Sequence, residues 1–574
     1  MVNLTINGKQ IAVEEHTTIL EAARANGIHI PTLCYLKELN EVAACRICLV
    51  EIEGVDKLMA SCNTECEEGM VVHTDTKSTR YARRINLELI FSQHKTDCLS
   101  CVRDGNCQLQ EVAKELNMTR HIEEVDARPN RWKSSRILER DNSKCIQCFR
   151  CINVCDRVQG MNVWDLLGTG KNAKVGINPA KKHFLEICAL CGQCITHCPT
   201  GALYVRDDTK KFYDAVEDPD MITVVQVAPA VRSAYGEAAG LPAELATEGR
   251  MAAAIKSLGV DYVFDTNFTA DLTIMEEGSE LLKKLGDKDA KLPMFTSCCP
   301  GWVRFIKIKY PELVGQLSSA KSPQQMFGAV TKSYFAEKNG VDPSKIFCIS
   351  IMPCTAKKYE CDVPEVQDVD AEGGIKDVDL VLTTRELTRL LRPVDIASLE
   401  EIPFDSPLGS GTGAAVIFGG TGGVMEAALR SAAFLVEGKN PDPAAFKKYD
   451  NPGQAWSEAS YEVGGTTVRT AVASGLANAD ALIQSILKGK TDVDFVEIMA
   501  CPGGCAGGGG QPIHDGLELA HDRGDILNAL DESNAIRYSH ENKEVAAMYE
   551  EYFGEPLSEK SHHLLHTDQT KWSL

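Results

Sequence analysis

The first residues of the chain alternate between apolar and polar positions. "LTINGKQIAV", residues 4–13, has two such runs around Asn7-Gly8, a pair that favours the type I′ turn of a β-hairpin. "TTILEAARANGI", residues 17–28, changes to helical spacing, with Thr17 or Thr18 as N-cap and Gly27 as the C-terminal stop. The pattern predicts two strands and a helix ahead of a cysteine-rich loop.

The second half of the chain contains short, continuous apolar runs: "ITVVQVAPAVR" (222–232), "KIFCISIMPC" (345–354), "VDLVLTT" (378–384) and "DFVEIMAC" (494–501). Helical segments such as "PAELATEGRMAAAIKSLG" separate them. This alternation predicts an α/β core with buried, largely parallel sheets. No apolar run reaches the length of a membrane span, and the first residues have no basic stretch followed by an apolar segment. We therefore expect a soluble cytoplasmic protein with no membrane insertion.

Cysteine content changes the picture, because the 574 residues include 23 cysteines. Sixteen lie between Cys34 and Cys198, and seven between Cys298 and Cys505. In a reducing compartment such clusters are typical of metal-binding or catalytic sites rather than disulfides. The formal net charge of −21 argues against a nucleic-acid partner, which requires basic patches.

Two segments share the spacing C-x2-C-x2-C-x3-C, which lets three thiolates face one cubane while the fourth reaches the partner cluster. They predict two [4Fe-4S] clusters, one held by Cys145, Cys148, Cys151 and Cys198, the other by Cys188, Cys191, Cys194 and Cys155. Zinc is the alternative, but zinc sites normally show two separated pairs of ligands.

Two further groups of possible ligands precede these motifs. The first has spacing C-x10-C-x2-C-x13-C, which suits a [2Fe-2S] cluster in a ferredoxin-like β-grasp domain: Cys34, Cys45, Cys48 and Cys62. Cys66 is a spare thiol. The second group fits another [4Fe-4S] cluster or a structural zinc site: His94, Cys98, Cys101 and Cys107.

The later cysteines fall in three long motifs: "TSCCPGW" (296–302), "MPCTAKKYE" (352–360) and "EIMACPGGCAGGGGQP" (497–512). Their glycines allow close approach of the backbone to a bulky cofactor, and the tract lacks the pattern of a phosphate loop. Together these motifs resemble the signature stretches of [FeFe] hydrogenases. "TIMEEGSELL" (273–282), "LSSAKSPQQMFG" (317–328) and "FGGTGGVMEAALRSA" (418–432) also resemble that family, so the likeness spans nearly the whole chain.

The resemblance implies reversible H2 oxidation and proton reduction at an H-cluster. By position, its [4Fe-4S] cube would be held by Cys299, Cys354, Cys501 and Cys505. Cys505 would also bridge to a di-iron subsite that carries CO, cyanide and a dithiolate amine. Cys298, beside the first ligand, would pass protons to and from that amine. Three accessory [4Fe-4S] clusters and one [2Fe-2S] cluster would relay electrons.

The resemblance also assigns roles to residues around the cofactor. Glu277, Glu280 and Ser318 would carry protons to the surface, although an acidic run on a helix is by default a solvated face. Lys357 would donate to a cyanide ligand, and the remaining cofactor neighbours would be Gln324, Met352, Met499 and Ala230. Ala230 stands where many members have serine, and Lys284 where some have arginine. Cys348 and Cys361 match no ligand, and we expect structural roles for both.

The expected fold class is a multidomain mixture of α+β and α/β parts. It comprises a [2Fe-2S] β-grasp domain (1–78), a His/Cys3 cluster domain (79–120), a two-[4Fe-4S] ferredoxin-like domain (136–212), an α/β H-cluster domain (213–515) and a small-subunit-like helical tail (516–574). In the tail we expect packing and surface roles for His562, His563 and His566.

The front half resembles the large iron-sulfur subunit of respiratory complex I. "APAVR" and "SHHLLHT" resemble the hydrogenase subunit of NAD(P)-linked, electron-bifurcating complexes. Expected partners are ferredoxin, flavin- or NAD(P)-binding iron-sulfur subunits and hydrogenase maturation proteins. A stand-alone ferredoxin-dependent hydrogenase is the alternative, and an H2-sensing or electron-transfer protein is the rival from another class.

Overall fold

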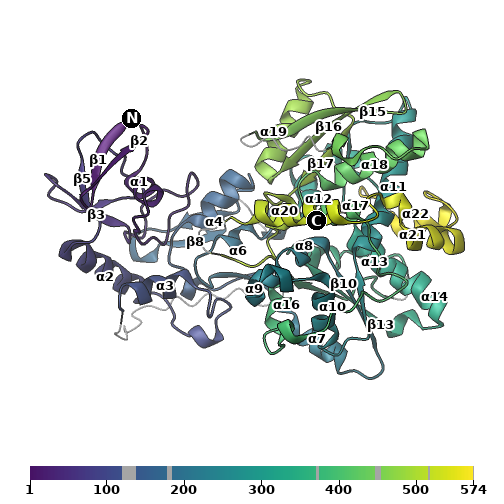
Figure 1. Ribbon diagram of the computed structural model, residues 1–574, viewed down its shortest axis with the longest axis horizontal. Coiled ribbons are helices and arrows are strands. Elements are labelled where there is room, and N and C mark those ends of the chain that lie inside the picture. Colours follow the sequence, from purple (N-terminus) through teal and green to yellow (C-terminus); the bar gives the residue numbers. More distant parts are fainter. Residues whose placement is uncertain (119–136, 178–183, 370–373, 447–453, 515–517, 573) are drawn as a thin grey trace.

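The computed structural model describes residues 1–118, 137–177, 184–369, 374–446, 454–514, 518–572 and 574. The cysteine-rich front half lies to one side of the molecule, and two sheets with their helices form the larger part (Figure 1). Within the described ranges, no helix is both long and apolar enough to cross a membrane.

The N-terminal sheet has five strands in the order β2-β1-β5-β3-β4. Their bounds are β1 Val2–Ile6, β2 Lys9–Val13, β3 Leu49–Ile52, β4 Met59–Ala60 and β5 Val71–His73. The predicted hairpin is confirmed, since β1 and β2 pair antiparallel and both turn residues, Asn7 and Gly8, have positive φ. The predicted helix is α1, Ile19–Ala25, whose N-cap Thr18 accepts a hydrogen bond from the Glu21 N–H.

The next two cysteine-rich regions are built from short elements. α2 (Lys77–Phe91) and α3 (Gln108–Glu115) flank the segment of His94. The region that follows has two antiparallel strand pairs, β6 with β9 and β7 with β8, and two short helices in contact: β6 Leu138–Arg140, β7 Trp164–Leu167, β8 Lys174–Ile177, β9 Leu203–Val205, α4 Arg150–Asn153 and α6 Gln193–Thr196. Each C-x2-C-x2-C-x3-C motif contains one of these helices.

The first sheet of the larger part is fully parallel, in the order β11-β10-β13-β14. Its strands are β10 Ile222–Val227, β11 Tyr262–Asp265, β13 Ile346–Met352 and β14 Leu380–Thr383. Three of them are apolar runs predicted from the sequence. The predicted helix is α10, Glu248–Lys256, and it begins at the N-cap Thr247. The expectation of a buried parallel sheet is confirmed here.

The second sheet is mixed, in the order β12-β17-β16-β15. Its strands are β12 Met294–Phe295, β15 Ser457–Val463, β16 Thr466–Ser474 and β17 Phe495–Met499. β12 and β16 run parallel to β17, but β15 and β16 form an antiparallel hairpin that the sequence analysis did not predict. Gly464 and Gly465, both with positive φ, make its two-residue turn. The expectation of largely parallel sheets is therefore wrong for this edge.

The long helix α11, Asn267–Gly286, joins the two sheets. Phe268 and Leu272 belong to the core of the parallel sheet, whereas Ile274 and Leu281 belong to the core of the mixed sheet. α11 also contacts α13 (Pro323–Val330) and α18 (Gly423–Glu437). Carboxylates on this helix consequently lie in the interior, between the two sheets.

The end of the chain packs back onto α11 and α13. It contains α20 (Ala520–Ser533), α21 (Lys543–Met548) and α22 (Glu559–Leu565), and Figure 1 shows α21 and α22 at the far end from the N-terminus. After α22, Ala320 and His566 form an antiparallel bridge, flanked by Lys321 N–H to Leu565 O and Thr567 N–H to Ser319 O, both 2.8 Å. The tail is thus joined by backbone hydrogen bonds to the segment that contains Ser318.

Candidate active site

Four thiols from both sheets converge in the interior. Cys354 lies two residues after β13 of the parallel sheet. Cys501 lies two residues after β17 of the mixed sheet, and Cys299 is the N-cap of α12, Pro300–Lys309, which follows β12. Cys505 lies in a glycine-rich turn at residues 504–507. The carboxyl ends of strands thereby supply the site, as is usual in α/β folds.

The electrostatics of these thiols reflects their convergence. Burial, and after it the charge of Cys299, raises the pKa of Cys501 to about 12. Burial, together with repulsion from Cys299 and Cys501, raises the pKa of Cys505 to about 12. The pKa of Cys354 is raised by burial and then by the other three thiols. Only a strongly cationic centre would hold four such groups as thiolates, so this donor set fits an iron-sulfur cube.

Polar side chains lie beside the four central thiols on the side of the parallel sheet. Lys357 donates to the carbonyl of Cys298 (3.1 Å) and to Glu360 Oε2 (2.8 Å). Burial lowers the pKa of Lys357, but Glu360 outweighs it, so the ammonium stays charged. Gln324 donates through Nε2 to the Lys357 carbonyl and to Glu360, while its buried Oε1 has no partner. A polar ligand of a cofactor could use these groups.

The apolar residues expected around the cofactor are buried in the same region. Met352 and Met499 end β13 and β17, and Met499 packs in the core that Cys298 and Cys299 border. Ala230 packs in a small apolar cluster bordered by Cys505. Its carbonyl accepts a hydrogen bond of 2.8 Å from Gln511.

The residues expected to carry protons interact in succession from the Cys298 thiol outward. Burial raises the pKa of Cys298 well above its usual value, and the charge of Glu277 raises it further. Burial and Glu280 together raise the pKa of Glu277 to about 8, opposed by a hydrogen bond with Ser318. Ser318 Oγ donates to Glu280 Oε2 at 2.9 Å, and Lys284 Nζ lies 2.8 Å from Glu280 Oε1.

Glu280 is the outer member of this line. Burial raises its pKa, but Lys284 and the hydrogen bonds from Ser318 and the Ser319 N–H outweigh burial and hold the pKa below its usual range. Glu280 and Lys284 line a surface pocket together with Ser319, His562, His566 and Asp568. The acidic run is therefore largely buried rather than a solvated face.

One further buried carboxylate near the site was not found from the sequence. Glu497, on β17, accepts hydrogen bonds of 2.7 Å from the N–H groups of Gly422 and Met425 at the start of α18. Burial raises its pKa to about 7, opposed by these N–H groups. It raises the pKa of both Cys298 and Glu277. Its position in "FVEIMAC" reads as an ordinary strand, and only the fold shows its surroundings.

In the structure, the fourth cysteine of each ferredoxin-like motif lies with the first three cysteines of the other motif. A cavity is lined by Cys145, Cys148 and Cys151 of the first motif and by Cys198 of the second. On the other side, burial raises the pKa of Cys194, and Cys188 and then Cys155 raise it further. The two sets are those proposed for two cubanes, and the cavity among the first four thiols fits such a group.

The members of each of the two upstream ligand groups also lie close together. A second cavity is lined by His94, Cys98, Cys101 and Cys107. In the N-terminal domain, hydrogen bonds join Cys34 with Cys45 and Cys48 with Cys62, and the four thiols influence one another's pKa. In the described part of the chain, no three His, Cys, Asp or Glu residues are grouped to hold a single metal ion. Cys66, Cys348 and Cys361 are buried thiols.

Hydrogen bonds connect the loops of neighbouring groups. Asn40 Nδ2 donates to the carbonyls of Cys34 (2.5 Å) and Cys148 (2.9 Å). Arg103 donates to the Cys198 carbonyl at 3.2 Å. The loops of the [2Fe-2S] group and of the His94 group thus both contact the group of Cys145, Cys148, Cys151 and Cys198.

The second ferredoxin-like motif contacts the four central thiols. Thr355, next to Cys354, donates to the Leu190 carbonyl at 2.6 Å, and Cys501 Sγ lies 3.8 Å from the Cys191 carbonyl. A Cβ on Gly509 would lie 2.2 Å from the Cys191 carbonyl oxygen, so this glycine allows two backbones to touch. The glycine-rich tract therefore packs against the neighbouring motif as well as bordering the cofactor region.

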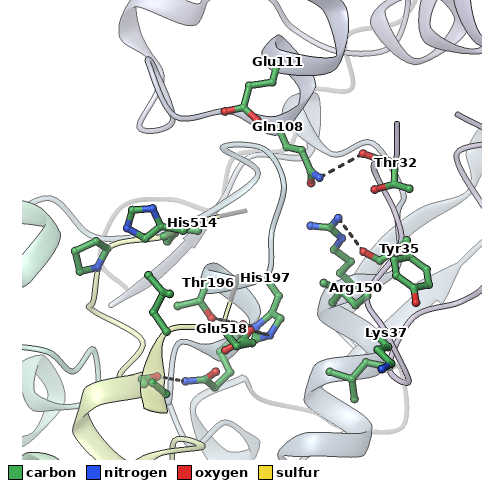
Figure 2. Close-up of a pocket in the computed structure, with 18 of the residues that line it drawn as sticks. Thr32, Tyr35, Lys37, Gln108, Glu111, Arg150, Thr196, His197, His514 and Glu518 are labelled. Carbon is green, nitrogen blue, oxygen red and sulfur yellow. Dashed lines mark hydrogen bonds and ion pairs between the residues drawn. The ribbon is translucent and has the colours of Figure 1, made fainter. Parts of the chain in front are cut away.

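A separate cavity lies between the front modules and the segment before α20 (Figure 2). Arg150 spans its wall and donates to the carbonyls of Cys34 (3.3 Å) and Tyr35 (3.1 Å). His197 lies 3.0 Å from Glu518 on the opposite side. The cavity marks where three regions of the chain meet.

Family models match five consecutive parts of the chain. Residues 221–509, half of the chain, match the iron only hydrogenase large subunit, C-terminal domain, and residues 517–572 match the iron hydrogenase small subunit. The front half matches a 2Fe-2S iron-sulfur cluster binding domain (1–77), the NADH-ubiquinone oxidoreductase-G iron-sulfur binding region (83–121) and the ferredoxin-like domain of NADH-quinone oxidoreductase subunit 3 (135–204).

Two curated relatives match nearly the whole chain, and others match about two-thirds of it. It is 44% identical to the NADP-reducing hydrogenase subunit HndD of Solidesulfovibrio fructosivorans, over 100% of this chain and 99% of the relative. It is 36% identical to iron hydrogenase 1 of Clostridium pasteurianum, over 99% of both chains. Cytosolic iron-sulfur assembly component 3 of Rattus norvegicus is 30% identical over 69% of this chain and 84% of its own.

A solved structure supports the same relationship. A variant of the [FeFe]-hydrogenase HydA1 from Chlamydomonas reinhardtii superimposes with a TM-score of 0.57 at 40% identity, covering 62% of this chain and 98% of that one. The chain therefore belongs to the iron-only, or [FeFe], hydrogenase family of oxidoreductases that act on H2.

Proposed function

We propose that the chain catalyses reversible H2 oxidation and proton reduction at an H-cluster held by Cys299, Cys354, Cys501 and Cys505. The observation that supports this most directly is the convergence of the four thiols beside Cys298, from which a chain of buried proton-carrying groups leads outward. When bound, the cofactor supplies the iron centre at which H2 is split or formed, together with its CO, cyanide and dithiolate-amine ligands.

The protein residues handle the proton. The Cys298 Sγ holds or releases it next to the cofactor, and Glu277 exchanges it with Cys298 through the carboxyl group. A pKa of about 8 suits Glu277 for this task, because a proton carrier works best with a pKa near the working pH. Ser318 Oγ links Glu277 to Glu280, from which the proton leaves beside Lys284. Lys357 and Gln324 orient polar ligands of the cofactor, while Met352, Met499 and Ala230 exclude water.

The front half holds three accessory [4Fe-4S] clusters and one [2Fe-2S] cluster under this proposal. The loops of the [2Fe-2S] and His94 groups contact the Cys145 group, whose partner motif contacts the central thiols. This order of contacts suits electron transfer between the surface and the active site. Iron at His94 is favoured over zinc because residues 83–121 match an iron-sulfur binding region.

We further propose that the chain is the catalytic subunit of a cytoplasmic, electron-bifurcating complex. Its support is the likeness to an NADP-reducing hydrogenase subunit and to two iron-sulfur regions of NADH-quinone oxidoreductases. Flavin- or NAD(P)-binding subunits and ferredoxin would exchange electrons with it, and maturation proteins would load the cofactor. A stand-alone ferredoxin-dependent hydrogenase is the alternative, supported by the full-length likeness to iron hydrogenase 1.

The test is an infrared spectrum of the anaerobically matured protein, because CO and cyanide bound to iron absorb where protein does not. We expect such bands, and we expect H2-dependent dye reduction by the same sample. If iron analysis shows all accessory clusters but the bands are absent even after reconstitution with a synthetic di-iron cofactor, the catalytic proposal fails. An H2-sensing or electron-transfer role, or one in iron-sulfur assembly, would then be favoured.

A further inference from the structure

A second buried carboxylate lies on α11 next to the proton path. Glu276 accepts hydrogen bonds from Tyr549 Oη (2.5 Å), Ser561 Oγ (2.7 Å), the Leu557 N–H (2.9 Å) and His566 Nε2 (3.0 Å). Burial raises its pKa, but His566 and Tyr549 outweigh burial and hold the pKa below its usual range. Glu276 is therefore ionised near neutral pH. Because a carboxylate only accepts, His566 Nε2 must carry the hydrogen of their contact.

The other face of the same imidazole touches the segment that holds Glu280. His566 Nδ1 lies 2.9 Å from Ser319 Oγ. The Ser319 N–H donates to Glu280 Oε2 at 3.0 Å, and Ser318 Oγ donates to the same oxygen at 2.9 Å. His566 is buried, and its contact with Glu276 is shielded from water, whereas Ser319 is half-buried at the lining of a surface pocket. One side chain thus connects Glu276 with the turn that supplies two donors to Glu280.

The tail also forms a wall of the pocket into which Glu280 opens. The titratable and charged groups around Glu280 are Glu277 and Lys284 on α11 and His562, His566 and Asp568 on the tail. His562 is exposed, and its ring centroid lies 4.5 Å from that of His566. The outlet of the proposed proton path is therefore formed by two segments about 290 residues apart in the sequence, α11 and the chain end.

We propose that His566 is a positioning residue of the proton path: by linking Glu276 to Ser319, it holds the Ser318–Ser319 donors on Glu280 and so sets the proton affinity of the path's outer carboxylate. This inference rests on the proposed function. Donors to an ionised carboxylate favour its charged form, so weakening them raises the pKa of Glu280. During H2 oxidation the ionised form must accept each outgoing proton. The acid limb of the pH–activity profile therefore depends on His566.

The main variant is His566→Ala, with His563→Ala as the matched control. His563 lies on α22, three residues before His566, and is exposed. We expect His566→Ala to shift the acid limb of H2 oxidation upward by roughly 0.5–1 pH unit. On the acid side of that limb, where turnover follows the ionised fraction of Glu280, we expect turnover to fall about three- to tenfold, the factor that corresponds to this shift. His563→Ala should keep the wild-type profile.

Two further variants keep the test decisive if His566→Ala folds poorly. Ser319→Ala removes only the hydroxyl that meets Nδ1, and it should shift the same limb in the same direction. His566→Gln retains a donor and an acceptor, and it should restore part of the wild-type profile. In cofactor-free protein, amide hydrogen exchange at residues 318–321 should be faster in His566→Ala than in His563→Ala, a readout that does not need activity.

Glu280→Gln separates this inference from the proposed proton path. If Glu280→Gln loses turnover while His566→Ala and Ser319→Ala keep the wild-type pH profile, the positioning role is wrong and the path stands. If Glu280→Gln keeps full turnover, the path itself is wrong and the positioning role falls with it. Infrared bands of the cofactor, measured in every variant, show whether a loss of turnover reflects loss of the active site.

Discussion

Replacing Glu277 by glutamine would test whether a buried carboxyl group carries protons at the centre of the path. The glutamate is buried, its Oε2 has no hydrogen-bond partner, and its pKa is raised from 4.5 to about 8 by burial and by the charge of Glu280. A difference of about 3.5 pH units corresponds to about 5 kcal/mol. At pH 7 roughly nine-tenths of the molecules should hold this proton, and at pH 9 about one-tenth.

The sign of the pH dependence follows from the same shift. A carboxyl pKa raised by folding adds stability that is fully present below pH 4.5 and is lost as the pH rises to about 8. Relative to Glu277→Gln, the wild-type free energy of unfolding should therefore fall by about 1.4 kcal/mol per pH unit across that window. Any fixed cost of fitting glutamine cancels in this slope. Turnover should fall ~10²–10⁴-fold, because an amide cannot take up the proton.

The assay is infrared titration of the protonated carboxyl C=O band, compared between wild type and variant. We expect a band that disappears with a midpoint near pH 8 in the wild type and is missing in Glu277→Gln. In Glu280→Gln the midpoint should move to lower pH, since a neighbouring negative charge is removed. A wild-type midpoint at or below about pH 5 would refute the argument from burial.

Three further predictions concern other parts of the molecule. Cys298→Ala should remove most turnover yet leave the CO and cyanide bands in place, whereas Cys505→Ala should lose the di-iron subsite; full turnover in Cys298→Ala would contradict the relay assignment. His94→Ala should lower the iron content by about four atoms per chain without changing zinc, and loss of zinc instead would establish a structural zinc site. Gly509→Ala should destabilise the protein by about 1–3 kcal/mol, because the new methyl group meets the Cys191 carbonyl oxygen. Gly524→Ala, in helix α20 with open space around it, is the matched control and should be neutral or stabilising in anaerobic thermal unfolding.

Local residue patterns correctly predicted the helices and strands whose ends are set by nearby turn or capping residues. The Asn7-Gly8 hairpin and the helix capped by Thr247 follow from turn and capping chemistry alone. The β15–β16 hairpin was not predicted, although Gly464-Gly465 stands between alternating runs. Continuous apolar runs indicate buried parallel strands, whereas a half-exposed edge strand contains no such run. Its outer residues Glu458 and Glu462 are exposed, which is the alternation expected of an edge.

The candidate site likewise has parts that local sequence patterns predict and parts that they do not. Cysteine spacing indicated the accessory clusters, but the central thiols come from three distant motifs, and only resemblance to a family related them. His566 was expected to have a packing or surface role. The contact between Glu276 and His566 spans 290 residues, and no local signal in "EEGSE" or "SHHLLHT" indicates it. Long-range hydrogen bonds of buried polar groups depend on how helices pack, which residue patterns do not encode locally.

The placement of the four central cysteines has a consequence for maturation. Cys354 follows a strand of the parallel sheet, whereas Cys299 and Cys501 follow strands of the mixed sheet, so any cofactor bound by all of them ties the two sheets together. A ligand that binds only the closed arrangement adds its binding free energy to that arrangement. The cofactor-free protein should then open more easily between its sheets and be cleaved faster by proteases. Binding of the cofactor would hold the two sheets in the closed arrangement, so resistance to proteases would distinguish the mature enzyme from the cofactor-free protein.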